Sequence, residues 1–97
     1  MRLRFTRRAV ENIAEIADYI RERNPKAAGR VRSAIYDSLQ NLLLFPLSGR
    51  ELRAHGVRKL VTPRLSYIVY YVVDPPMAEV IILSVKHPAQ EREHDDR

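Results

Sequence analysis

The chain has 97 residues, no cysteine and a formal net charge of +5. This length predicts one small domain, and the lack of cysteine excludes a disulfide framework, a thiolate metal site and a cysteine nucleophile. Fourteen of the 17 basic residues are arginine, whose planar guanidinium suits phosphate or carboxylate, so we expect an acidic partner, either nucleic acid or protein.

No apolar run reaches 18 residues, and the first ten residues hold four arginines without the apolar stretch of a signal peptide. We therefore expect a cytoplasmic protein that does not enter a membrane. The three histidines are too scattered to form a ligand motif. No metal and no cofactor are expected.

The first half of the chain predicts a short strand and two helices. Residues 2–5 (RLRF) alternate arginine with apolar side chains, as a half-buried strand does. Thr6 is a candidate N-cap for a helix over residues 7–22. Its expected apolar stripe is Val10, Ile13, Ala14, Ala17 and Ile20.

Asn24 and Pro25 favour capping and starting a second helix, which would end near residue 45 at Phe45-Pro46. The apolar stripe expected for this helix is Ala28, Val31, Ile35, Leu39, Leu42 and Leu43. Because the connecting turn is short, the two helices should form an antiparallel hairpin.

The second half of the chain reads as strands. Residues 57–62, 66–73 and 78–85 are rich in valine, isoleucine and tyrosine and are separated by turn residues, which predicts a three-stranded meander. The fold class is therefore expected to be α+β in the order β-α-α-β-β-β, with the helical hairpin packed on a small antiparallel sheet. We expect residues 1–90 to form a single domain and residues 91–97 a polar tail.

Five segments of the chain resemble, in their order and spacing, the ParE/RelE superfamily of toxins from bacterial type II toxin–antitoxin modules. These segments are NIAEIADYI, NPKAA, LLLFPLSGREL, YIVYYVV and ILSVKH. The resemblance covers residues 2 to about 90. It implies a cognate, ParD-like antitoxin as partner. It leaves two functions open, because RelE-like members cleave messenger RNA on the ribosome whereas ParE-like members poison DNA gyrase.

The resemblance also implies where RNA cleavage would occur. RelE-like enzymes carry basic residues on the second strand, an arginine before the third strand, and an arginine, histidine or tyrosine near the end of the fourth. Arg58, Arg64 and His87 match in part and would be the catalytic residues of an endoribonuclease. Tyr67, however, occupies the arginine position before the third strand and cannot supply a permanent positive charge.

We therefore favour a gyrase poison that works by binding, without enzymatic chemistry of its own. A ribosome-dependent endoribonuclease is the alternative, and a member that only binds antitoxin is a third possibility. The expected target-binding residues are Arg50, Arg53, Arg58, Arg64, Lys86 and His87, with ordinary solvated charge as the other interpretation. The expected antitoxin-binding residues are Arg7, Arg8, Ile13, Ile20, Val31 and Ile35.

Two further features allow more than one interpretation. His87 suits a general base, a residue that ends the last strand before Pro88, or a contact to a target. Tyr67, Tyr70 and Tyr71 are interpreted as core packing, with stacking on nucleic-acid bases as the alternative.

Overall fold

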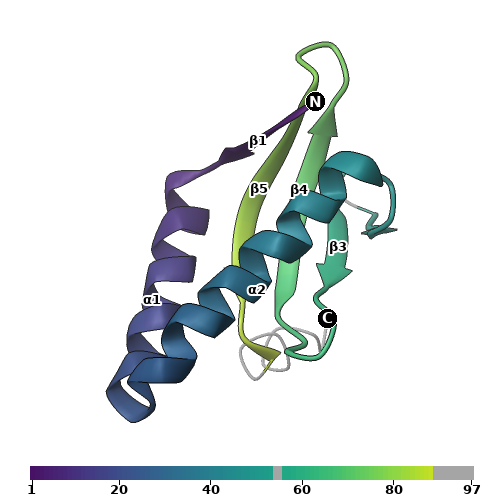
Figure 1. Ribbon diagram of the computed structural model, residues 1–97. Helices are drawn as coiled ribbons and strands as arrows, with labels where there is room; N and C mark the ends of the chain where they lie inside the picture. Colours follow the sequence, from purple (N-terminus) through teal and green to yellow (C-terminus); the bar gives the residue numbers. More distant parts are fainter. Residues whose placement is uncertain (54–55, 89–97) are drawn as a thin grey trace.

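The computed structural model describes residues 1–53 and 56–88, so the predicted polar tail lies outside the described residues. The elements in chain order are β1 (Arg2–Phe5), α1 (Arg7–Arg23), α2 (Pro25–Leu44), β2 (Arg50–Glu51), β3 (Arg58–Val61), β4 (Ile68–Asp74) and β5 (Glu79–Lys86). The strands form one sheet in the order β1-β5-β4-β3-β2. In Figure 1, α2 crosses diagonally over β5 and β4 while α1 runs beside it, so both helices cover the same face. The α+β prediction is confirmed.

The sheet is mixed, which differs from the antiparallel sheet expected from the sequence. Strand β1 pairs in parallel with β5, with Arg2 opposite Glu79 and Phe5 opposite Ile82, while the other pairs are antiparallel. Alternation in a short strand fixes which side chains face the core, but it does not identify the partner strand or its direction.

Strand β2 was not among the strands expected from the sequence. Its two residues, Arg50 and Glu51, pair with Lys59 and Arg58 of β3. Two residues are too few to show a strand period in the sequence, so local pattern could not identify this edge strand. The predicted bounds of β3, β4 and β5 differ from the observed ones by one or two residues at either end.

The helix boundaries follow their capping residues, as predicted. The Thr6 hydroxyl accepts a hydrogen bond from Ala9 N (3.1 Å) at the start of α1 and donates one to Leu83 O of β5 (2.8 Å). The Asn24 side chain accepts from Ala27 N (3.2 Å), and Pro25 begins α2. Within the described chain, neither helix has the length and apolar composition that crossing a bilayer requires.

The core lies between the helices and the covered face of the sheet. Its fully buried members include Ile13 of α1, Ile35 and Leu39 of α2, and Val69 and Tyr71 of β4. The stripe predicted for α2 is confirmed, with Ala28, Ile35, Leu39 and Leu42 buried and Val31 and Leu43 partly buried.

The stripe predicted for α1 needs a correction. Ala9 is fully buried, whereas Val10 is 53% exposed and Ala14 also faces solvent. Because successive helical residues are about 100° apart, a stripe centred on Ala9 and Ile13 turns Val10 away from the sheet.

Candidate functional site

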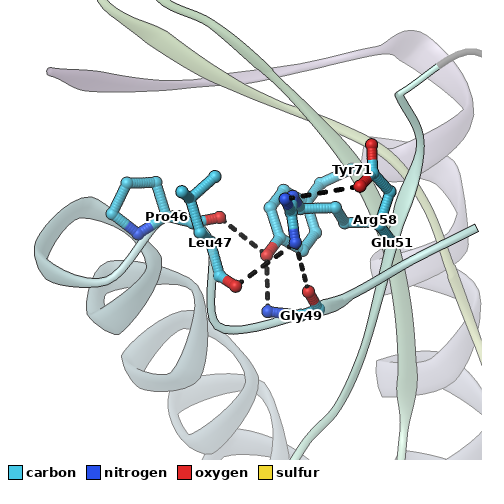
Figure 2. Close-up of polar contacts among 6 residues, drawn as sticks. All are labelled: Pro46, Leu47, Gly49, Glu51, Arg58 and Tyr71. Atoms are coloured by element: carbon cyan, nitrogen blue, oxygen red, sulfur yellow. Dashed lines mark hydrogen bonds and ion pairs between the residues drawn. The ribbon is translucent and has the colours of Figure 1, made fainter.

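Arg58, a candidate for both catalysis and target binding, is occupied by contacts within the protein. Its Nη1 donates hydrogen bonds to Gly49 O (2.7 Å) and Leu47 O (3.3 Å), and its Nη2 lies 4.0 Å from Glu51 Oε1. Only 19% of the side chain is exposed. Figure 2 shows the guanidinium directed at the loop between α2 and β2. Arg58 therefore braces this loop.

Tyr71 holds the same loop from beneath. Its hydroxyl accepts a hydrogen bond from Gly49 N (2.8 Å) and donates one to Pro46 O (2.8 Å) (Figure 2). A Cβ at Gly49 would lie 2.6 Å from that hydroxyl oxygen, so the approach requires glycine. Since Arg58 and Tyr71 are paired across β3 and β4, the sheet register places both side chains at the loop.

The other two catalytic candidates lie toward the opposite end of the sheet. Arg64 is exposed in the turn between β3 and β4, where it has a left-handed backbone with φ of 67°. His87 is an exposed residue that follows β5, and its ring meets that of Tyr67 edge to face with centroids 5.6 Å apart. Both positions are well removed from the loop that Arg58 braces.

The register gives the scale of this separation. Lys86 pairs with Ile68, which places His87 level with Tyr67, whereas Arg58 is level with Tyr71. Four residues of extended chain, at about 3.3 Å each, amount to roughly 13 Å along the sheet. The structure therefore does not bring Arg58 together with His87.

Tyr67, which stands where RelE-like enzymes carry arginine, is 6% exposed. Burial raises the pKa of its phenol above the ordinary tyrosine value, so the group is neutral at physiological pH. The core interpretation is confirmed for Tyr67 and Tyr71. Tyr70 is half-buried, with the Lys86 ammonium 5.8 Å from the centre of its ring.

A cavity of about 360 Å³ opens beside His87, between α1 and the end of β5. Asn12, Ile16 and Tyr19 of α1 line one side, and Tyr67 and His87 line the other. The Asn12 side chain accepts a hydrogen bond from Val85 N (3.0 Å), which fixes α1 against the strand. With mostly apolar walls, the cavity suits an apolar side chain of a partner.

The remaining target-binding candidates are divided between two regions. Arg50 and Arg53 are exposed beside the braced loop, whereas Lys86 is half-buried at the end of β5. The six candidates therefore do not form one continuous patch, because Arg58 lies beneath the loop and Arg64, Lys86 and His87 lie toward the far end of the sheet.

The predicted antitoxin residues are corrected in part. Ile35 is 0% exposed and belongs to the core, so it cannot touch a partner in this conformation. Ile13 is 2% exposed and also belongs to the core, but it lines a groove between the two helices. Arg7 and Arg8 are exposed in the first turn of α1, and Ile20 and Val31 are partly exposed. A groove of about 220 Å³ between the helices is lined by Val10, Ala14, Asp18, Arg21, Arg32 and Tyr36, among others.

Sequence reasoning missed three exposed apolar residues at the end of α2: Leu44, Phe45 and Leu47. The signal was present, because residues 42–45 are four consecutive apolar residues. At about 100° per residue they cannot share one helix face, so some of them must point to solvent. Among residues 1–53 and 56–88, no three His, Cys, Asp or Glu side chains are grouped so that they could hold a metal ion.

Comparison with known proteins places the chain among toxins. A family model described as the ParE toxin of the type II toxin–antitoxin system parDE matches residues 3–92. The Y4kP protein of Sinorhizobium fredii, whose name proposes it as a toxin, is 37% identical over 90 residues, which cover 93% of this chain and 91% of that protein.

Two solved toxin–antitoxin structures share the fold. The chromosomal ParDE system of P. aeruginosa matches with a TM-score of 0.78 at 24% identity, covering 90% of this chain and 95% of that one. The RelBE2 toxin–antitoxin complex of Mycobacterium tuberculosis matches with a TM-score of 0.63 at 26% identity, covering 90% of each chain.

Proposed function

Because the chain belongs to the ParE toxin family of type II toxin–antitoxin systems, we propose that it arrests growth by poisoning DNA gyrase and is neutralised by a ParD-like antitoxin. In this proposal the toxin binds gyrase and holds it in the state in which DNA is cleaved. The action needs neither metal nor cofactor. It takes place in the cytoplasm, where gyrase acts on DNA.

The positions of the cationic side chains favour gyrase over RNA as the target. Cleavage through a 2′-hydroxyl needs a base, an acid, and positive charge on the developing phosphate. Here the guanidinium of Arg58 is bonded to loop carbonyls, and the position before β4 holds a buried neutral phenol, Tyr67. This arrangement supports binding over cutting.

A supercoiling assay with purified gyrase tests the proposal. Toxin at micromolar concentration is expected to inhibit supercoiling and to increase the fraction of cleaved plasmid, and preincubation with antitoxin should abolish both effects. Toxin that leaves supercoiling and cleavage unchanged at this concentration, while still arresting growth, would exclude gyrase as the target.

Ribosome-dependent cleavage of messenger RNA remains the second candidate because His87 and Tyr67 lie together at one end of the sheet. In that case induction of the toxin should produce new 5′ ends in translated messages, detectable by primer extension. His87→Gln should abolish these ends.

If growth continues normally when the chain is induced alone, the third possibility, a member that only binds antitoxin, is supported instead.

The antitoxin proposal rests on charge and on the exposed parts of the helices. Residues 1–87 carry 15 basic and 8 acidic residues, a net charge of +7, which favours an acidic partner segment. The groove between α1 and α2 is lined by the exposed apolar Val10 and by the charged Asp18 and Arg32. A segment that orders on binding can fill such a groove. Co-expressed toxin and antitoxin that elute separately in light scattering would contradict a stable complex.

A further inference from the structure

Three large apolar side chains project from one short segment at the end of α2. Leu44 is 71% exposed, and Phe45 and Leu47 are each 65% exposed. Single exposed apolar residues are normal on a protein surface, whereas a contiguous group is typical of an interaction site. We name Leu44, Phe45 and Leu47 the apolar knob. Figure 1 shows that the end of α2 and the following loop lie at one edge of the molecule.

The backbone beneath the apolar knob is held by hydrogen bonds within the chain. Phe45 N donates to Asn41 O (3.0 Å), and Ser48 N donates to Phe45 O (3.0 Å). The Tyr71 hydroxyl binds the carbonyl of Pro46, and Arg58 binds the carbonyl of Leu47 (Figure 2).

The exposed side chains are therefore mounted on a rigid loop. A rigid loop loses little conformational entropy on binding, so its contact area is converted efficiently into affinity. Arg58 and Tyr71 act here as positioning residues.

The charge around the apolar knob indicates its partner. Arg50 and Arg53 follow within six residues of Leu47 and are exposed, and one exposed carboxylate, Glu51, lies between them. Aromatic residues and arginine are enriched at protein–protein interfaces, so Phe45 beside two exposed arginines fits such a composition. Carboxylates around the partner's site would complement these arginines.

The shape of the apolar knob limits the kind of partner that can bind it. Side chains about two-thirds exposed project from the surface and do not line a groove, so they require a concave partner. A disordered antitoxin segment that folds on the toxin is itself convex and suits a groove such as that between α1 and α2. A concave apolar socket belongs to a folded protein.

From these observations we propose that the apolar knob inserts into an apolar, carboxylate-rimmed socket on the folded protein that the toxin inhibits. This inference rests on one part of the proposed function, namely that the target of the toxin is a protein. The antitoxin uses a different surface. Target binding and antitoxin binding are therefore separable by substitution.

The test compares the triple variant Leu44→Gln, Phe45→Gln, Leu47→Gln with wild type and with Met77→Gln. Met77 is 59% exposed in the turn between β4 and β5, so it is a matched control for losing exposed apolar surface. Since truncating a hot-spot anchor commonly weakens binding by about 30-fold or more, the triple variant should lose at least about 30-fold in gyrase inhibition and should fail to arrest growth. Its antitoxin affinity and melting temperature should stay within error of wild type, because none of the three side chains is in the core.

The possible outcomes separate the two proposals. If the triple variant arrests growth as strongly as wild type, the role of the apolar knob is overturned. It is also overturned if the triple variant loses antitoxin affinity as much as it loses inhibition of the target. A wild-type toxin that sediments as a dimer, and a triple variant that sediments as a monomer, would assign the knob to a second copy of the chain and also overturn it. If wild type arrests growth without affecting gyrase, the gyrase proposal fails, and growth arrest by the variant still decides the role of the knob.

Discussion

Removing one oxygen atom, by Tyr71→Phe, should destabilise the whole fold because that hydroxyl connects the loop after α2 to the central strand β4. Without it, Gly49 N–H stays buried with no acceptor, which costs about 1–3 kcal/mol. The carbonyl of Pro46 is half-buried and can be hydrated, so its loss is about 0.5–1.5 kcal/mol. Together the unfolding free energy should fall by about 2–4 kcal/mol, a large part of the roughly 5–15 kcal/mol typical of a domain this size.

Urea and thermal unfolding followed by circular dichroism measure this loss. At about 4–8 °C per kcal/mol, the melting temperature should fall by roughly 8–32 °C, with an unchanged urea m-value. Tyr36→Phe is the matched control, since no hydrogen bond of the Tyr36 hydroxyl occurs among the described residues. A Tyr71→Phe variant within about 0.5 kcal/mol of wild type would show that the loop is not held by this hydroxyl.

Three further predictions concern stability. Gly49→Ala should lower the unfolding free energy by about 1–3 kcal/mol, because its Cβ would lie 2.6 Å from the Tyr71 hydroxyl oxygen and 2.7 Å from the Tyr71 ring. A double-mutant cycle with Tyr71→Phe should show non-additive losses, since both changes act on the same contact; additive losses would contradict it. Ala78→Gly should raise the unfolding free energy by about 0.5–1 kcal/mol, since Ala78 has a left-handed φ of 51° that glycine adopts without strain. The gain is measured as a higher urea midpoint. Burial raises the pKa of Tyr67, so its contribution to stability is complete below the unfolded-chain pKa of about 10 and is lost as pH rises through the folded pKa. Tyr67→Phe should therefore lose less unfolding free energy than wild type between about pH 8 and 11 in urea titrations; equal losses would refute the link.

Local sequence signals were enough to predict most of the fold. Capping by Thr6 and Asn24 set the helix starts within a residue, and the valine- and isoleucine-rich segments located the three long strands. Pairing between distant strands was harder. The parallel partner of β1 is 77 residues away in the sequence, and no local pattern encodes that contact. The two-residue β2 is defined by its pairing to β3 alone.

The candidate site was predicted less well, and for a physical reason. Sequence reasoning treated Arg58 as a cation available to a target because it lies where the resemblance implies a basic residue on the second strand. Its actual role depends on two carbonyls, Leu47 and Gly49, that the chain presents only after the loop has folded. Backbone acceptors have no sequence signature, so a side chain that serves them looks the same as one that serves a ligand.

The relative size of two effects explains why recruiting Arg58 for catalysis would gain little. Placing a hydrogen-bond donor on a developing oxyanion typically contributes about 2.7–4 kcal/mol to a reaction rate. Turning the guanidinium toward a substrate would break its short bond to Gly49 O and its longer one to Leu47 O, at about 1.5–3 kcal/mol for the short charge-assisted bond alone. Because the cost offsets much of the gain, turning Arg58 toward a substrate would lower the activation barrier by little. In its observed position it holds the carbonyl of Leu47, one of the three residues of the apolar knob.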